Sequence, residues 1–231
     1  MNRIIVFALM FFCMTMQIEA QTLSEEEVTA KMYQAFELNK AAKKAEALEL
    51  FLIVGENTKQ QRNEGERQVY VCSQTMACQC YELLGRYKEG YLLGKSLLQG
   101  KLNDTERKDV GHLYAMNGYM YACEFIQRDE KGRADYKRGR ELISEILPYS
   151  DGQVKEYAET KIPLSWYFEG AQYAMTQSYD EALSSYEEAL NGFRDLGRVS
   201  EEVDVLSGIA SVKAHLCKFD EAKRVYYQAF V

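Results

Sequence analysis

The stretch WYFEGAQYAMTQSYDEALSSYEEAL, residues 166–190, decides the fold of this chain. Its first half places a large, a small and a large residue at steps of four and three, and its second half alternates large and small residues at steps of three, four and three. Because these are helical steps, each set lies on one face of a helix. We expect two short antiparallel helices joined by a tight turn. The small residues that let them approach are Gly170, Ala182 and Ala189, and the large residues that fill the gaps are Trp166, Tyr173 and Tyr186.

This pattern resembles the tetratricopeptide repeat, whose signature is W-x2-L-G-x2-Y in the first helix and A-x3-F/Y-x2-A in the second. The chain departs from the signature at Glu169, where the family usually has leucine. The resemblance implies an all-α, right-handed superhelical solenoid whose first helices line a concave, ligand-binding side. One pair cannot bury its apolar face alone, so we expect further copies on both sides.

Together with four weaker copies of the pattern, this pair predicts about five helix-turn-helix pairs after residue 20. In the last copy, Phe219, Ala222, Tyr226 and Ala229 repeat the second-helix pattern at an offset of 40 residues, and Cys217 stands where the turn often has glycine. The expected pairs span residues 24–57, 63–100, 104–148, 153–194 and 199–231. Their second helices carry a small residue at Ala47, Gly90, Gly139, Ala182 and Ala222.

Three local features refine this division. Ser24 and Glu27 have the spacing of a capping box, which starts the first helix. The charged segment 127–134 predicts a projecting loop. Pro163 is expected to begin the helix that carries Trp166, which leaves residues 153–161 as a separate turn or a kinked lead-in.

The N-terminus has the pattern of a secretory signal peptide. Residues 1–3 supply a basic start, residues 4–16 form an apolar run, and Ala20 provides a small residue for cleavage. We therefore expect residues 1–20 to be removed and the mature chain, residues 21–231, to be periplasmic or extracellular. An uncleaved anchor is the alternative, and no later stretch of the sequence is apolar enough to span a bilayer.

Composition and charge exclude several classes of function. Apolar residues make up 47% of the chain, which is too many for a disordered protein. The formal net charge is −7, and no basic cluster occurs. An acidic chain without such a cluster is a poor candidate for binding nucleic acid or an anionic membrane.

The five cysteines of the mature chain are expected to fill helix seams as small buried residues. Their odd number leaves at least one unpaired unless it bridges two chains. We expect no metal site, because neither His112 nor His215 has a ligand spacing to a cysteine. These cysteines are Cys72, Cys78, Cys80, Cys123 and Cys217.

No motif of a known catalytic chemistry occurs, and with two histidines there is little basis for nucleophilic catalysis. We therefore expect no enzyme and no cofactor. A hydrolase would need two acids that meet across the groove, which sequence spacing cannot show.

The resemblance places the candidate binding residues on the concave side of the first helices. At the positions where some family members clamp a carboxylate with asparagine, this chain has other residues, so capture of a chaperone tail is not expected. The side chains suit a peptide or an extended protein segment. The expected groove residues are Gln79, His112, Tyr119, Tyr167, Met175, Ser211 and His215, with Thr75, Glu82, Cys123, Ala171 and Asp204 beside them.

The sequence thus predicts a non-catalytic, exported scaffold that binds a protein or a peptide. An alternative is the periplasmic sensor region of a membrane-bound histidine kinase or transcription regulator, to which exported repeats of this type are similar. The last helix stops abruptly at Val231. This chain could therefore be the front part of a longer protein, it could pack its end on a partner, or it could tolerate a frayed tip. The sequence does not fix the oligomeric state.

Overall fold

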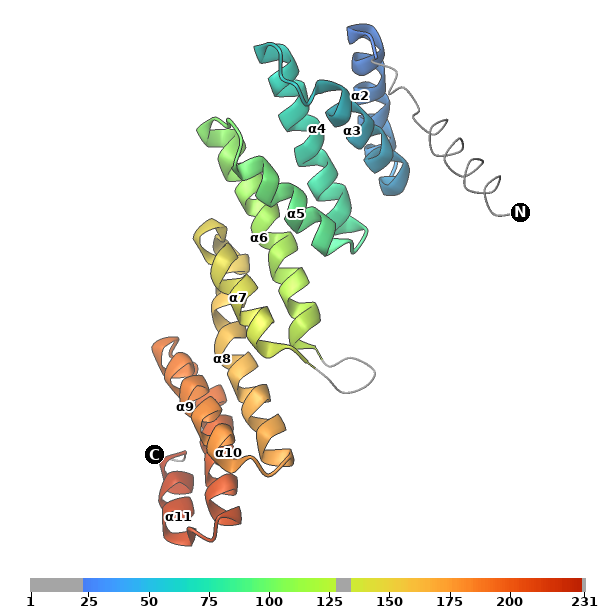
Figure 1. Cartoon of the computed structure of the whole chain (residues 1–231). Coiled ribbons are helices and arrows are strands. Elements are labelled where there is room, and N and C mark those ends of the chain that lie inside the picture. Colours follow the sequence, from blue (N-terminus) through green and yellow to red (C-terminus); the bar gives the residue numbers. More distant parts are fainter. Residues whose placement is uncertain (1–22, 128–133, 230–231) are drawn as a thin grey trace, which may run out of the picture. The chain divides into compact units, whose positions relative to one another are not determined.

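The computed structural model describes residues 23–127 and 134–229, and all of the regular structure within these ranges is helical (Figure 1). The all-α class predicted from the sequence is confirmed. The expected signal peptide, residues 1–20, and most of the expected loop at residues 127–134 lie outside the described residues. The chain divides into two compact units, one up to Ala77 and one from Cys78 onward, and the boundary falls within helix α4.

The first unit contains α2, α3 and the first part of α4. Ala35, Ala47 and Phe51 are fully buried, and the ring of Phe51 meets the ring of Phe36 edge to face, with centroids 5.4 Å apart. The predicted capping box is confirmed, because Ser24 accepts from the Glu27 amide and Glu27 accepts from the Ser24 amide. The bounds are Glu25–Lys40 for α2, Lys44–Thr58 for α3 and Glu64–Leu83 for α4.

The second unit contains the end of α4 and all later helices. From α5 onward each helix packs against the next, and in addition α6 contacts α8 and α8 contacts α10. These are the first helices of successive predicted pairs. The bounds are α5 Tyr87–Leu98, α6 Asp104–Ile126, α7 Tyr136–Ile146, the 3-10 helix η1 Leu147–Tyr149, α8 Gly152–Met175, α9 Tyr179–Asp195, α10 Val199–His215 and α11 Phe219–Gln228.

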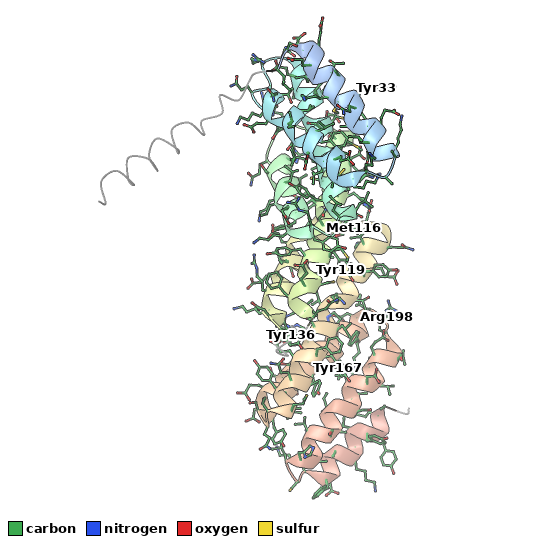
Figure 2. All side chains as sticks on the ribbon, turned by 90° about the vertical axis from the view of Figure 1, so that its right-hand side faces the viewer. Tyr33, Met116, Tyr119, Tyr136, Tyr167 and Arg198 are labelled. Carbon is green, nitrogen blue, oxygen red and sulfur yellow. The ribbon has the colours of Figure 1, made fainter. Side chains whose placement is uncertain are left out.

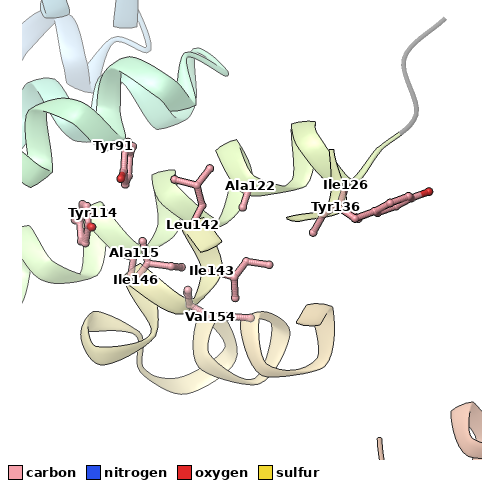
Figure 3. Packing of buried hydrophobic residues seen from close by; sticks show 11 residues of the cluster. Tyr91, Tyr114, Ala115, Ala122, Ile126, Tyr136, Leu142, Ile143, Ile146 and Val154 are labelled. Carbon is pink, nitrogen blue, oxygen red and sulfur yellow. The ribbon is translucent and has the colours of Figure 1, made fainter. Parts of the chain in front are cut away.

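Two apolar clusters form the core of the second unit. The first joins α5, α6, α7 and the start of α8, where Ile143 and Ile146 are fully buried and Tyr91 stacks on Tyr114 at 5.3 Å (Figure 3). The second joins α8 to α11 around Tyr186 and Phe193. In both clusters, bulky side chains of one helix fill the spaces beside small residues of the next helix, as the alternation of large and small residues in the sequence predicts.

Glycine allows the closest of these approaches. A Cβ atom added to Gly170 would lie 2.8 Å from the ring of Tyr186, and one added to Gly118 would lie 2.5 Å from Cγ2 of Ile146. Ala182 and Ala189 are fully buried, as the sequence predicts.

Five of the helix-to-helix turns share one backbone geometry. In each, a residue with positive φ is followed by an amide that donates to the carbonyl five residues earlier, at 2.9 Å. This bond closes a Schellman motif, which satisfies a carbonyl at the helix end. Cys217 has a φ of 58°, which confirms that it takes a position often held by glycine. The five residues are Ala42, Gly85, Gln177, Gly197 and Cys217.

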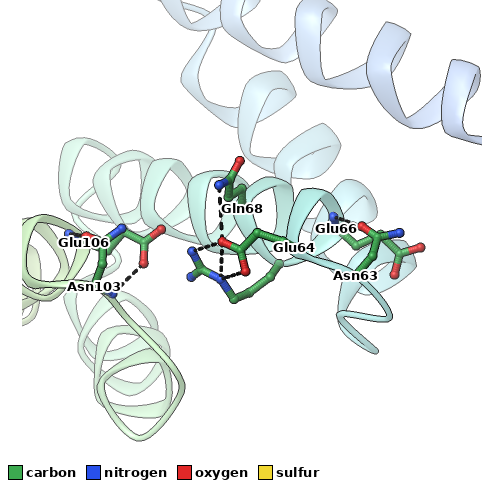
Figure 4. A network of polar contacts seen from close by, with 7 residues as sticks. Asn63, Glu64, Glu66, Gln68, Asn103 and Glu106 are labelled. Atoms are coloured by element: carbon green, nitrogen blue, oxygen red, sulfur yellow. Dashed lines mark hydrogen bonds and ion pairs between the residues drawn. The ribbon is translucent and has the colours of Figure 1, made fainter.

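Polar side chains begin the long helices α4 and α6 (Figure 4). Asn63 accepts from the Glu66 amide at 2.8 Å, and Asn103 forms a capping box with Glu106. Arg67 and Gln68 both donate to Glu64 on the first turn of α4. The bonds to Asn63 and Asn103 satisfy amides that a helix leaves without an internal partner.

Two expectations about α8 are wrong. The helix does not begin at Pro163, because α8 runs from Gly152 through that residue to Met175. A proline within a helix removes one hydrogen bond, and here its buried ring packs against Gly192 of α9. Tyr173 does not fill a gap between helices, since 36% of it is exposed.

The expectation that the five cysteines are buried between helices is confirmed for three of them. Cys78, Cys80 and Cys123 are buried, whereas Cys72 and Cys217 are exposed. None of these five, all within the described ranges, forms a disulfide.

Candidate functional site

Helices α6 and α8 border the hollow that we name the α6–α8 groove, with a volume of about 640 Å³. Figure 2 shows Met116 and Tyr119 on α6. Tyr119 and Met120 follow Met116 at steps of three and four, so the three residues lie on one side of the helix. The first turns of α8 supply the opposite wall. The residues that line the groove are His112, Met116, Tyr119, Met120, Asp151, Gly152, Gln153, Val154 and Tyr157.

The link between α7 and α8 positions the second wall. The 3-10 helix η1 contains Pro148, and α8 begins directly after Asp151. Asp151 makes no side-chain cap to α8; its carboxylate lies 3.0 Å from Nδ1 of His112. This contact fixes one end of the groove and joins its two walls.

Aromatic rings form the middle of the groove. Tyr119 and Tyr157 stack with centroids 6.4 Å apart and an interplanar angle of 28°. Burial is the main cause of the raised pKa of Tyr119, and its hydrogen bond with the Cys123 thiol adds to the shift. Beside this ring, Met116 and Met120 offer flexible apolar surface that adapts to different ligand shapes.

One end of the groove carries the His112–Asp151 pair. Burial raises the pKa of Glu82, a half-buried residue on α4, while His112 acts to lower it. The groove is mainly apolar, with the His112–Asp151 pair at one end. It suits an apolar or aromatic anchor with a polar flank more than a highly charged ligand.

The structure brings only two of the predicted site residues, His112 and Tyr119, into this groove. Gln79 is exposed on α4, and Met175 is 75% exposed at the end of α8. Tyr167 contacts Phe168 and Tyr186 beside the second core cluster.

The last two predicted residues lie near the end of the chain. His215 stacks on Tyr179 with centroids 5.9 Å apart, and Ser211 lines a separate hollow on α10 and α11. The seven predicted residues therefore do not form one continuous site.

Four residues that line the groove were not predicted from the sequence: Met116, Met120, Asp151 and Tyr157. The two methionines were recognisable, because they follow His112 at steps of four and eight along one helix face. Tyr157 was missed for a different reason. It falls in the segment that Pro163 was expected to separate from the helix.

Two polar clusters lie outside the groove. Glu145 of α7 accepts hydrogen bonds from the hydroxyls of Tyr91 and Tyr114, at 3.0 and 2.6 Å, and pairs with Lys95 at 2.7 Å. Burial acts to raise the pKa of Glu145, but its three hydrogen-bond partners outweigh this effect and hold the pKa below the ordinary value. These contacts join α7 to α5 and α6, so the cluster has a structural role.

Arg140 of α7 and Glu169 of α8 form the second cluster. The guanidinium also donates to Ser165 and lies 3.4 Å above the centre of the Trp166 ring. Glu169, the residue at which the sequence departs from the repeat signature, is therefore the partner of a buried arginine.

The described residues contain no group of three or more His, Cys, Asp or Glu side chains placed to hold a metal ion. Within the same ranges, every helix is too short or too polar to cross a membrane. No protein-family model matches the chain, and no curated protein matches it either.

Proposed function

We propose that this chain is a non-catalytic scaffold of tetratricopeptide-like helix pairs that binds a peptide segment of another protein in the α6–α8 groove. The single observation that carries the proposal is this groove, which has an apolar and aromatic floor and a His112–Asp151 contact at one end. Such a surface accepts an extended or helical segment through one or two apolar anchors.

A repeat architecture is consistent with two features of the second unit. First helices of successive pairs contact one another, and the turns recur with one geometry. Stacked pairs of this kind present their first helices side by side as a binding surface. Export is proposed from the pattern of residues 1–20 alone. Cell fractionation tests export, and recovery of the protein only from the cytoplasm would contradict it. Sequencing the N-terminus of exported protein tests cleavage, and a start at Met1 would contradict cleavage after Ala20.

The binding proposal is tested with a random 12-residue peptide library displayed on phage and selected against the full chain. We expect enriched peptides with aromatic or large aliphatic anchors, and their synthetic versions should bind in fluorescence anisotropy. Met120→Lys places a charge in the groove and should weaken binding at least tenfold. Met175→Lys is the matched control, because Met175 is exposed at the far end of α8.

Two results would contradict the groove assignment. One is equal binding by wild type and Met120→Lys. The other is a loss in Met175→Lys as large as that in Met120→Lys. If no peptide is enriched over a selection against an unrelated helical protein, the peptide-binding function itself is rejected.

A further inference from the structure

The α6–α8 groove presents an acidic group at one end. Among the described residues that line it, Asp151 is the only carboxylate, and neither lysine nor arginine is among them. The side chain of Asp151 is 60% exposed, and its partner His112 is 47% exposed. Glu82 of α4 adds a second carboxyl, close enough to His112 for their charge interaction to act on its pKa. The groove therefore offers no fixed cation to an acidic ligand.

Asp151 is the N-cap residue of α8, yet its carboxylate does not cap the helix. An aspartate at this position ordinarily accepts a hydrogen bond from an amide of the first turn, which stabilises the helix by about 1 kcal/mol. Asp135 does so at the start of α7, where it accepts from the Arg138 amide at 3.0 Å. Asp151 lacks this bond, and its Oδ1 lies 3.0 Å from Nδ1 of His112 instead. A local preference that is given up in this way is expected at functional positions.

The contact with His112 leaves part of this carboxylate available. Within the described ranges, the Asp151 side chain makes no other hydrogen bond or ion pair, so Oδ2 is open to a ligand. His112 holds the group at the groove, which reduces the conformational freedom that binding would remove. A cationic side chain can donate to Oδ2 in a charge-assisted hydrogen bond, which is stronger than a bond between neutral groups.

The aromatic part of the groove lies at a defined separation from this carboxylate. Tyr157, whose ring stacks on Tyr119, follows Asp151 by six residues, which is about 9 Å along a helix. An extended segment covers this length in about three residues, and a helical segment covers it in about six. A ligand that uses both parts of the groove therefore carries its charged residue and its apolar anchor at one of these two separations.

On the basis of the peptide-binding function proposed above, we propose that the segment bound in the α6–α8 groove carries an arginine or lysine that pairs with Asp151, beside an apolar anchor that packs at Tyr119 and Tyr157. Complementary charges of this kind determine specificity and orientation more than total affinity. An acidic residue of the partner is disfavoured at this end, because it would face Asp151 with no lysine or arginine among the lining residues to pair with.

Two phage libraries of 12-residue peptides, selected in parallel against the full chain, test this charge preference. One library encodes no lysine, arginine or histidine, and the other encodes no aspartate or glutamate. Peptides that use the groove are recognised because Met120→Lys weakens their binding. We expect these peptides to come from the library without acidic residues, and to carry arginine or lysine at one of the two separations from their apolar anchor.

A synthetic peptide from this selection then tests the pairing with Asp151 by fluorescence anisotropy. Asp151→Asn, which keeps a good N-cap residue, should weaken binding about tenfold, or about 1.4 kcal/mol. Replacing the basic residue of the peptide by methionine should have the same effect, and the two changes together should lose no more than either alone. Asp151→Lys should bind the peptide that carries glutamate at that position. Asp180→Asn, which alters an exposed acid on the first turn of α9, is the matched control and should leave the affinity unchanged.

The possible results distinguish this pairing from peptide binding itself, once circular dichroism shows that each variant is folded. Groove-dependent peptides without a basic residue, equal binding by wild type and Asp151→Asn, or additive losses in the combined experiment overturn the pairing, while peptide binding in the groove stands. If neither library yields a peptide that Met120→Lys weakens, the groove function is rejected and the pairing with it.

Discussion

Nη2 of Arg140 lies 2.7 Å from Oε2 of Glu169, in a mostly buried ion pair that joins α7 to α8. The guanidinium is stacked on Trp166, the first residue of the repeat signature in α8. Arg140 and Glu169 are charged residues between two helices that otherwise pack through apolar side chains, and each compensates the charge of the other. A leucine at position 169 would leave the arginine buried without its counter-charge.

The first prediction concerns this pair. Glu169→Leu should lower the free energy of unfolding by about 3 kcal/mol, because it leaves a buried charge unpaired. Arg140→Met combined with Glu169→Leu should recover most of the loss, since apolar residues of similar size replace both partners. Urea denaturation of the two single variants and the double variant measures the coupling. If the double variant loses the sum of the single losses, the two residues are not coupled.

The second prediction compares two glycines on the same helix, α6. Gly118→Ala should destabilise the fold by about 2 kcal/mol, because the new methyl group meets Ile146 and Tyr91 at 2.5 and 3.1 Å. Gly111→Ala should stabilise it by about 0.5 kcal/mol, since the nearest atom, on Tyr149, is at an ordinary contact distance of 3.4 Å and alanine favours helix. Thermal unfolding of both variants gives the comparison. Equal effects would show that α6 tolerates both positions alike.

The third prediction uses the lowered pKa of Glu145. A carboxyl whose pKa is lower in the folded than in the unfolded chain stabilises the fold above its ordinary pKa, near 4.5, and this contribution falls as the pH drops below that value. The difference in unfolding free energy between wild type and Glu145→Gln should be constant from pH 7 to about pH 5.5 and should decrease from pH 4.5 downward. Urea denaturation at a series of pH values measures it. A difference that does not depend on pH would contradict the contribution of the Lys95, Tyr91 and Tyr114 contacts.

The fourth prediction concerns thiol reactivity. In the native chain, Cys72 and Cys217 should react with a thiol reagent at pH 8, whereas Cys78 should not, because burial raises its pKa to about 12 and shields the sulfur. Cys80 and Cys123, which are also buried, should react only in denaturant. Peptide mapping by mass spectrometry after labelling identifies each site. Rapid native labelling of Cys78 would mean that the seam between α4 and α5 opens readily.

The sequence was sufficient to predict the helices and most of their ends, because helical periodicity and turn residues are local signals. It also predicted the buried small residues at Gly170, Ala182 and Ala189. Pro163 misled the prediction, since its compatibility with α8 depends on packing against Gly192, a residue that is distant in sequence.

The candidate site was harder to predict, for a related reason. The positions of His112 and Tyr119 in a predicted first helix were enough to place them in the groove. Asp151 and Tyr157 line the groove because η1 and the start of α8 bring them next to α6, which the sequence does not show. The role of Glu169 likewise depends on Arg140, 29 residues earlier. Contacts of this kind have no local periodicity that a single sequence can reveal.

The five recurring turns do not depend on glycine. Positive φ is held by glycine at only two of the five positions, and alanine, glutamine and cysteine hold the others. For these residues the left-handed conformation costs about 1 kcal/mol each. Packing of the helices on either side offsets this cost. A turn can therefore form without glycine at this position. Glycine is therefore not a reliable marker of where this chain reverses direction, because packing of the flanking helices holds other residues in the same backbone conformation.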